Sequence, residues 1–419
     1  MRKNIAIIVD SIDVNDSSGS KANVAIINNL AAIGYNLTVF HYTQKDIQLK
    51  NISSILIKEN KYNLLYVLSR AQRVMQRYSK LNLAKYLEPI FGFSFTYFND
   101  VNSIKSALKK HDTSKFNLIL TLSKGASFRP HYALNKLPYL HNKWLAYIHD
   151  PYPMSCYPPP YQWEEPGYKQ KQHFFKEVSL HARNAAFPSQ LLKDWVGSFF
   201  PNFIHTGIVI PHQNFEEEEE VEDVPAPNYF DSTKFNILHA GNLMKQRNPE
   251  GLLKGFKLFL ENKPEAKKDA RLLLLGNADY HKNFIIHYVN NVNEIYVQLS
   301  NIPFSNVFWL QNKVAVNVIL EAKSEISPFL PGKFPHCVAS KKPIIHLGPK
   351  HSETRRLLGE NYPYWADIDN AEAISTILQT LYELWTTNKN GFMLERPDLE
   401  RYLGTTYLKE QIESVFNNV

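Results

Sequence analysis

The chain has 419 residues, of which 44% are hydrophobic and 13% aromatic, and this composition excludes a disordered protein and predicts two well-filled globular domains. The net charge of +7 is uneven, because residues 1–211 hold 25 Lys and Arg against 13 Asp and Glu, whereas the remainder holds 22 against 27. The basic half suits either an anionic lipid or phosphorylated partner or an ordinary solvated surface, while nucleic acid is disfavoured because no recognition motif accompanies the charge.

No apolar run approaches the ~18 residues that a helix needs to cross a membrane. The first apolar run ends at Asp10, too early for a signal peptide, and it predicts a buried strand over residues 5–9. The two cysteines, Cys156 and Cys337, are too far apart in sequence to indicate a disulfide framework. We therefore expect a reducing, cytoplasmic location.

The next segments continue the alternation of strands and helices. A polar loop ending in Ser-Ser-Gly-Ser leads to a predicted helix over residues 21–33, and residues 37–41 predict the second strand. This order is typical of an α/β half-domain. In such a domain Gly19 would let the backbone approach a ligand at the mouth of the sheet.

Residues 64–81 predict a basic amphipathic helix. Its apolar stripe consists of Leu64, Leu68, Ala71, Val74, Met75 and Tyr78, and its cations are Arg70, Arg73, Arg77 and Lys80. The pattern suits a helix that lies on an anionic membrane surface. It equally suits a helix whose apolar stripe packs on the core while its basic side faces water.

Further strands are predicted at residues 116–122 and 144–148, and the second is followed by His149 and Asp150. Polar groups at the carboxyl end of a strand in an open α/β sheet face the ligand site. His149 is therefore a candidate to contact a sugar hydroxyl or a phosphate, with Asp150 orienting it; the alternative is a purely structural histidine. The loop 156–167 is rich in Pro, Tyr and Trp and is a candidate wall for a sugar or lipid-linked acceptor.

Strands at 185–188 and 208–210, with a helix capped by Ser189 between them, complete a first domain over residues 1–211. The acidic, proline-bearing segment 212–233 predicts a solvated linker. A second α/β domain is expected over residues 234–395. A last helix within 396–419 is a candidate to pack back on the first domain.

The stretch 235–253, FNILHAGNLMKQRNPEGLL, is the most informative in the chain. Its first six residues predict a strand, which a Gly-Asn pair ends, and Asn248 and Pro249 predict the N-cap and first position of a helix. Free N–H groups at that helix start, beside two cations, suit a diphosphate. The alternative is an ordinary βα unit with solvated cations. The residues of interest are Asn242, Lys245, Arg247 and Asn248.

The remaining segments repeat the α/β rhythm. Strands are predicted at 271–275, 306–310 and 342–347, and helices at 315–323, 333–340, 371–385 and 399–416, with an irregular loop at 324–332.

With these elements in order, the chain resembles the GT-B glycosyltransferases, and within them the retaining, GT4-type enzymes. The resemblance is carried by SSGSKANVAIINNLAAIGYNLTVF, AYIHDPYP, AAFPSQLLKDWV with GIVIPH, ILHAGNLMKQRNPEGLLKGF and PFLPGKFPHCVASKKPIIHLG. It implies two Rossmann-like, doubly wound α/β domains facing a cleft. It also implies transfer of a sugar, with retention, from a UDP- or GDP-linked donor to a glycan or lipid-linked acceptor, as in polysaccharide biosynthesis, without a metal or other cofactor.

The resemblance also assigns roles to residues. Arg247, Lys333 and the helix start at Asn248 would stabilise the leaving diphosphate electrostatically, and His149 would position the donor sugar. Asn242 and Gly19 would lie at the donor. If the helix at 64–81 binds lipid, the protein would work at the inner face of the membrane.

One departure from the family pattern concerns its two Glu residues. The position of the Glu that binds the ribose hydroxyls is occupied by His336, and the position eight residues earlier is Pro328. A neutral His still hydrogen-bonds a hydroxyl, but it lacks the charge of a carboxylate. Ser327 is a candidate to contact the sugar or phosphate in its place.

Two alternatives of other classes stay open. An inverting GT-B enzyme or a sugar-nucleotide epimerase would be favoured by a carboxylate or His near residues 10–16 that acts as a base. A catalytically impaired GT-B domain that only binds or scaffolds would be favoured by the loss of the Glu pair.

Overall fold

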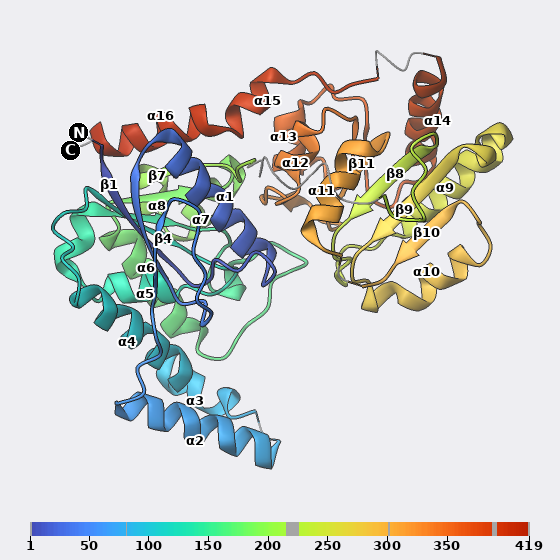
Figure 1. The fold of residues 1–419 in the computed structure, drawn as a ribbon. Coiled ribbons are helices and arrows are strands. Elements are labelled where there is room, and N and C mark those ends of the chain that lie inside the picture. Colours follow the sequence, from blue (N-terminus) through green and yellow to red (C-terminus); the bar gives the residue numbers. More distant parts are fainter. Residues whose placement is uncertain (1, 81, 215–225, 301, 388–391, 418–419) are drawn as a thin grey trace. The chain divides into compact units, whose positions relative to one another are not determined.

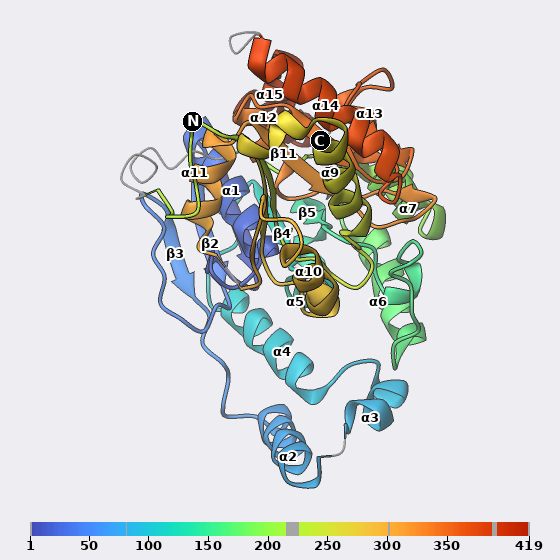
Figure 2. The ribbon, with the colours of Figure 1, turned by 90° about the vertical axis from the view of Figure 1, so that its right-hand side faces the viewer.

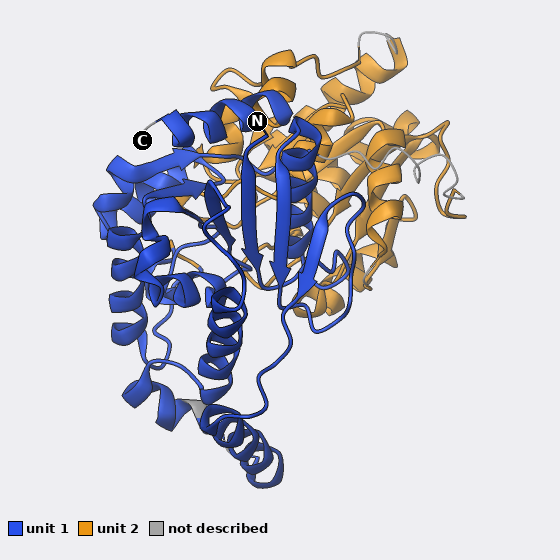
Figure 3. Cartoon of the chain, turned by 60° about the vertical axis from the view of Figure 1, so that its left-hand side comes forward, with its two compact units in different colours: residues 1–157, 161–215, 404–419 blue, residues 158–160, 216–403 orange. Residues whose placement is uncertain are grey.

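The computed structural model describes residues 2–80, 82–214, 226–300, 302–387 and 392–417. The chain divides into two compact units, which Figure 3 colours separately. Unit 1 comprises residues 1–157, 161–215 and 404–419, and unit 2 comprises residues 158–160 and 216–403. The acidic run of the predicted linker, residues 216–223, lies outside the described residues.

Unit 1 is built on a parallel seven-stranded sheet in the order β3-β2-β1-β4-β5-β6-β7. Its strands are β1 (Asn4–Val9), β2 (Asn36–His41), β3 (Ser53–Leu56), β4 (Leu118–Leu122), β5 (Trp144–Tyr147), β6 (Asn184–Phe187) and β7 (Gly207–Val209). Its helices are α1 (Ser18–Ile33), α2 (Leu64–Ser79), α3 (Ala84–Phe91), α4 (Phe95–Lys109), α5 (Arg129–Asn135), α6 (Tyr168–His181), α7 (Gln190–Phe199), α8 (Asn202–Thr206) and α16 (Thr405–Asn417), with 3-10 turns η1 (Pro138–Lys143) and η2 (Met154–Cys156). Figure 1 labels most of these elements.

Unit 2 repeats the plan with a parallel six-stranded sheet in the order β10-β9-β8-β11-β13-β15. Its strands are β8 (Phe235–Ala240), β9 (Ala270–Leu275), β10 (Ile295–Gln298), β11 (Val316–Leu320), β13 (Ile344–Leu347) and β15 (Trp365–Ala366), and β12 (Ile326–Ser327) pairs separately with β14 (His351–Ser352). Its helices are α9 (Glu250–Asn262), α10 (Lys282–Val289), α11 (Phe304–Lys313), α12 (Phe334–Ala339), α13 (Glu353–Leu358), α14 (Ala371–Thr387) and α15 (Pro397–Tyr402), with 3-10 turns η3 (Pro264–Lys268) and η4 (Asp279–His281).

Both sheets have the Rossmann order, in which the chain winds outward from a central first strand in both directions. Central strands such as β1, β8 and β11 are almost entirely buried, because helices cover both faces of a parallel sheet. The predicted fold class of two doubly wound α/β domains is therefore confirmed. None of the described helices is long and apolar enough to cross a membrane.

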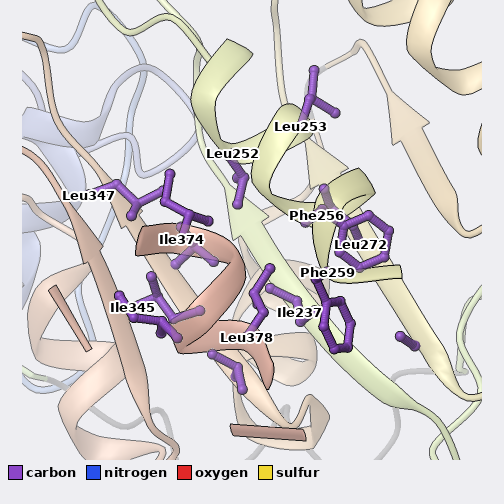
Figure 4. Close-up of a cluster of buried hydrophobic side chains, with 14 of the residues drawn as sticks. Ile237, Leu252, Leu253, Phe256, Phe259, Leu272, Ile345, Leu347, Ile374 and Leu378 are labelled. Atoms are coloured by element: carbon purple, nitrogen blue, oxygen red, sulfur yellow. The ribbon is translucent and has the colours of Figure 1, made fainter. Parts of the chain in front are cut away.

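The core of unit 2 lies where α9 and α14 cover one face of the sheet. Figure 4 shows Leu252 and Phe256 of α9 and Ile374 and Leu378 of α14 gathered around Ile237 of β8. All five side chains are fully buried. This packing holds the start of α9 against the carboxyl end of β8, the segment that the sequence singles out.

Two predicted elements of unit 2 are wrong, because a helix lies where a strand is predicted and a strand lies where a helix is predicted. Residues 306–310, predicted as a strand, lie in helix α11, and residues 315–323, predicted as a helix, contain strand β11. A short apolar run does not show whether its residues follow the repeat of a helix or that of a strand. In β11 the polar Asn317 also interrupts the apolar run that would indicate a buried strand. Its side-chain amide is buried and donates to Gln311 O at 3.0 Å and Ser340 Oγ at 3.1 Å, so the strand tolerates it.

The predicted last helix, residues 399–416, is also wrong as a single element, because the chain breaks between α15 and α16. Helix α16 belongs to unit 1, where it packs beside α1. It buries Leu408, Ile412 and Val415 in the core of that unit. Glu413 also accepts hydrogen bonds from Lys3 Nζ at 2.8 Å and Tyr35 Oη at 2.6 Å.

We predict that Ile412→Ala destabilises unit 1 by about 2–5 kcal/mol, since it removes a fully buried side chain and leaves a cavity. Lys409→Ala, an exposed position on the same helix, is the control and should change stability by less than about 0.5 kcal/mol. Denaturant unfolding followed by fluorescence measures both, and equal midpoints for the two variants would show that α16 contributes nothing to the core.

Candidate functional site

Each sheet has a point where the strand order reverses, and ligands of doubly wound folds bind at the carboxyl ends of the strands there. In unit 1 this point lies between β1 and β4, and in unit 2 it lies between β8 and β11. We call these the unit 1 switch point and the unit 2 switch point. The polar residues that follow these strands are the candidate functional residues.

At the unit 2 switch point, glycine allows the loop after β8 to lie against its neighbours. Gly241 has a φ of +151° and Gly276, after β9, has a φ of +131°, both in the region that side chains disfavour. A Cβ atom on Gly276 would lie 2.5 Å from the Gly241 carbonyl oxygen, and one on Gly241 would lie 3.0 Å from Lys333 Nζ. The Lys333 ammonium group therefore lies directly over bare backbone at the end of β8.

The charges at this point are positive and close together. Burial, with a smaller contribution from the Arg247 guanidinium, lowers the pKa of Lys333 to about 8, although Cys337 acts in the opposite direction. Burial, Lys333 and Arg247 also hold the pKa of His239 well below its ordinary value, so this imidazole is neutral. Within the part of the chain that the structure describes, none of the charges that shift the pKa of Lys333 belongs to a carboxylate. An anion bound here would relieve the repulsion between the two cations.

The start of α9 differs from the prediction by one residue. Pro249 is the N-cap and the helix begins at Glu250. The side chain of Asn248 still serves the helix start, because its Oδ1 accepts from the Glu250 N–H at 3.0 Å. A side chain at Gly251 would collide with the backbone of Ile368, so the first turn is packed against that loop. The positive character of the site therefore comes from Lys333 and Arg247 more than from free helix N–H groups.

The predicted donor residues of unit 2 lie in different surroundings. Asn242 is exposed beside Gly241, and Arg247 lies near Lys333. His336 instead packs on helix α11, with ring centroids 5.2 Å from Phe304 and 5.3 Å from Phe308.

Ser327 is buried near a carboxylate that the sequence analysis missed. Glu321 follows β11, and its Oε1 accepts from His346 Nε2, at the end of β13, at 2.9 Å. Burial opposes its ionisation, but the hydrogen bond from His346, with smaller effects of the nearby Ser327 and Thr354 hydroxyl groups, lowers the pKa of Glu321 overall. Polar residues at strand ends had pointed to His149, and the same rule would have found Glu321 if β11 had not been predicted as a helix.

The unit 1 switch point holds a buried network of charged groups. Asp10, at the end of β1, accepts from Ser127 Oγ at 2.5 Å, and Ser127 accepts from Arg129 Nη1 at 2.7 Å. Arg129 Nε donates to Asp100 Oδ2 at 2.9 Å, and Tyr42 Oη donates to Asp100 Oδ1 at 2.8 Å.

Asp10 is the member of this network with spare bonding capacity. Its Oδ1 is buried and has no hydrogen-bond partner among the described residues. Burial raises the pKa of Asp10, although Arg129 and Ser127 partly offset this effect. A carboxylate with a raised pKa and one unpartnered oxygen has the properties of a proton acceptor.

His149 and Gly19 lie nearby in the same unit. The His149 Nε2–H donates to Asn23 Oδ1 at 2.7 Å, and its ring stacks on His212 with centroids 5.4 Å apart. Burial, with a smaller effect of His212, holds the pKa of His149 well below its ordinary value, so the ring is neutral. Gly19 lies in the first turn of α1, where a Cβ atom would make ordinary 3.7 Å contacts with the turn after β4.

No group of three or more His, Cys, Asp or Glu side chains in the described residues is arranged to hold a metal ion. The sequence does contain an Asp-x-Asp pattern at Asp367 and Asp369. In the structure Asp369 is ion-paired with Lys323.

Comparison with known proteins gives structural matches only. No protein-family model and no curated protein sequence matches the chain. A glycosyltransferase from Rickettsia africae is 14% identical, with all of both chains covered and a TM-score of 0.60. A UDP-forming trehalose-phosphate synthase from Burkholderia xenovorans is 11% identical, with 100% of this chain and 99% of that chain covered and a TM-score of 0.64. Anabaena HepE, in complex with UDP and glucose, is 8% identical over the whole of both chains, with a TM-score of 0.60.

The chain has the GT-B fold. The predicted resemblance is confirmed at this level, because the matches span the chain from end to end. Because ligands of doubly wound folds bind at such points, the two switch points described above are the places to seek ligands of this chain.

We predict that Arg247→Gln raises the pKa of Lys333 above its value of about 8, because it removes the positive charge that lowers it. NMR of 13C-methylated lysine side chains in a pH titration measures this shift. Lys245→Gln removes an exposed cation from the same loop and should leave the Lys333 titration unchanged. Identical titrations in both variants would show that Arg247 and Lys333 do not share a site.

Proposed function

We propose that the protein is a metal-independent glycosyltransferase that binds the diphosphate of a nucleotide-sugar donor at the unit 2 switch point. The observation that carries the proposal is the Lys333 ammonium group, held over the bare backbone of Gly241 with the Arg247 cation close by. The HepE structure holds UDP and glucose, and the Burkholderia synthase is described as UDP-forming, which supports a UDP-linked donor; a GDP-linked donor is the next candidate.

The proposed mechanism is mainly electrostatic. As the bond between the sugar and the diphosphate breaks, negative charge develops on the leaving group, and Lys333 and Arg247 are preorganised to stabilise it. The absence of a side chain at Gly241 leaves room for phosphate oxygens to approach the backbone. Because the two cations already supply positive charge, the proposal assigns no metal ion to the site.

We place the acceptor, a glycan or lipid-linked sugar, at the unit 1 switch point, where His149 and Asp10 lie. Retention follows from the GT4 resemblance, and the departing phosphate would then take the proton of the acceptor hydroxyl. Inversion is the second candidate, and the buried, unpartnered Oδ1 of Asp10 favours it, because an inverting enzyme needs a base on the acceptor side.

We predict that UDP-sugars raise the melting temperature of the protein more than GDP-, dTDP- or ADP-sugars, since a ligand that binds only the folded state stabilises it.

Arg247→Gln should weaken nucleoside diphosphate binding about 10- to 100-fold, because it removes a hydrogen bond to a charged group. Isothermal calorimetry with UDP measures this loss.

Lys245→Gln is the matched control for that prediction and should bind UDP almost as the wild-type protein does. Wild-type affinity in Arg247→Gln would remove the diphosphate assignment. If no nucleotide sugar shifts the melting temperature, the impaired GT-B domain becomes the better description, with His336 in place of the usual Glu as the first residue to restore.

The anomeric configuration of the product decides between the two stereochemical outcomes. We expect a retained product by NMR, with Asp10→Asn reducing turnover by less than the ~100-fold that a general base contributes. Asp13→Asn, in the same loop but paired with Lys45 at 2.5 Å, is the control. An inverted product together with a loss above ~100-fold in Asp10→Asn alone would sink the retaining mechanism and identify Asp10 as the base.

A further inference from the structure

Helix α2 presents its apolar side outward. Five large apolar side chains on it are between 53% and 84% exposed: Leu64, Val67, Val74, Met75 and Tyr78. At about 100° of rotation per residue, all five lie within an arc of about 100° around the helix axis, so they form one stripe along the helix. The alternative in which this stripe packs on the core is therefore wrong.

The opposite side of α2, which faces the rest of unit 1, is polar. Its buried residues are Ser69 and Gln72. Gln72 Oε1 accepts from the Phe95 N–H at the start of α4, and the Asn63 side chain, which caps α2, donates to Asn99 Oδ1 at 3.0 Å. A helix on a protein surface normally buries its apolar face and exposes its polar face, so α2 has the reverse arrangement.

The cations of α2 flank its exposed apolar stripe. Arg70 and Arg77 have no acidic partner among the described residues, whereas Arg73 is paired with Glu59 at 3.5 Å. Between positions 58 and 91 there are seven Lys or Arg and two Glu, a net charge of +5. The second acid, Glu88, is paired with the buried Lys171 at 2.9 Å, so neither carboxylate neutralises the remaining cations.

Helix α3 adds a second exposed apolar patch and is firmly attached. Tyr86 and Ile90, one turn apart, are 66% and 69% exposed. On its other side Lys171 of α6 bridges Glu88 of α3, at 2.9 Å, and Glu165, at 2.5 Å. Figures 1 and 2 show α2 and α3 at the end of unit 1 beyond α4, away from the strands, and Figure 3 shows them projecting from the rest of that unit.

We propose that α2 and α3 form a docking surface for an anionic lipid bilayer, with the apolar stripe inserted among the lipids and the arginines on the headgroups. An outward apolar stripe matches the acyl chains of a bilayer in polarity, and the unneutralised cations that border it match the anionic headgroups in charge. The proposal does not depend on the donor site, because it rests on residues of unit 1 alone. It would place a lipid-linked acceptor within reach of the protein.

A second copy of the chain is a poorer occupant for the same surface. Face-to-face packing of two such patches would bring two segments of net charge +5 together, and juxtaposed like charges oppose association. Anionic headgroups instead supply the opposite charge along the whole length of α2.

Co-sedimentation of the full-length protein with vesicles tests the proposal. We expect binding to vesicles of phosphatidylcholine with 30% phosphatidylglycerol, and at least ~10-fold weaker binding to phosphatidylcholine alone. The quadruple variant Leu64→Ser, Val67→Ser, Met75→Ser and Tyr78→Ser should lose binding. Arg70→Gln with Arg77→Gln should weaken it about 25-fold, at about fivefold for each cation near an anionic surface.

Lys109→Gln with Lys110→Gln is the matched control, because it removes the same charge from exposed positions at the far end of α4, about 20 Å along that helix from its start. It should bind as the wild-type protein does. If the control and the arginine variant lose vesicle binding equally, the proposal is wrong, and the binding comes from a general attraction of the basic residues 1–211 to anionic lipid. If the wild-type protein instead self-associates and does not bind vesicles, and the quadruple variant stays monomeric, the docking surface is a dimer interface and the lipid proposal is wrong.

Tyr78→Trp provides a test that does not depend on a loss of vesicle binding. Because the chain already contains six Trp, the signal is the difference between the emission of this variant and that of the wild-type protein under the same conditions. This difference spectrum should shift to shorter wavelength with the anionic vesicles, since an indole inserted between headgroups leaves water. An unshifted spectrum under conditions in which the protein sediments with the vesicles would show that the stripe stays in water, and it would rule out insertion.

Discussion

The reversal of strand order in each sheet is the constraint on which the rest of the molecule depends. A chain that winds both ways from its first strand sends the following helices to opposite faces, so the loops after the two central strands diverge and leave an opening at the carboxyl edge. In unit 2 those loops begin at Gly241 and Glu321, and in unit 1 they begin at Asp10 and Ser123. The candidate ligand-binding groups of both units are carried by one of these edges or by a segment packed against it.

The two switch points use this opening with opposite electrostatics. Unit 2 brings the cations Lys333 and Arg247 close together beside a neutral histidine and bare backbone, and like charges this close repel each other. Unit 1 buries Asp10 and Asp100 around a single Arg129. Such strained groupings cost stability, and proteins keep them mostly where function needs them. These opposite environments are the basis for assigning the proposed donor diphosphate to unit 2 and the proposed acceptor to unit 1.

The sequence predicted the parts of the fold that depend on local patterns. Buried strands such as β1 and β8 were found because uninterrupted apolar runs bounded by Gly or Asp leave little choice. Arg247 was proposed for a phosphate site because cations follow a glycine turn there, whereas Lys333 was assigned through the family resemblance alone. The strand at β11 was missed because Asn317 is satisfied only by partners six and twenty-three residues away. His336 was assigned by alignment alone, and its packing on Phe304 and Phe308 could not be seen in the pattern. Helix α2 shows the remaining limit: its amphipathicity was evident, but periodicity does not say which side faces the protein.

The return of α16 to unit 1 has a consequence for how the chain folds during its synthesis. The sheet of unit 1 is complete once β7 has been made, but the side chains of Leu408, Ile412 and Val415, which close its core over α1, follow only after residues 216–403. Until then β1 and α1 expose an apolar strip, so a ribosome-bound unit 1 is open to aggregation or chaperone binding for as long as unit 2 takes to be translated.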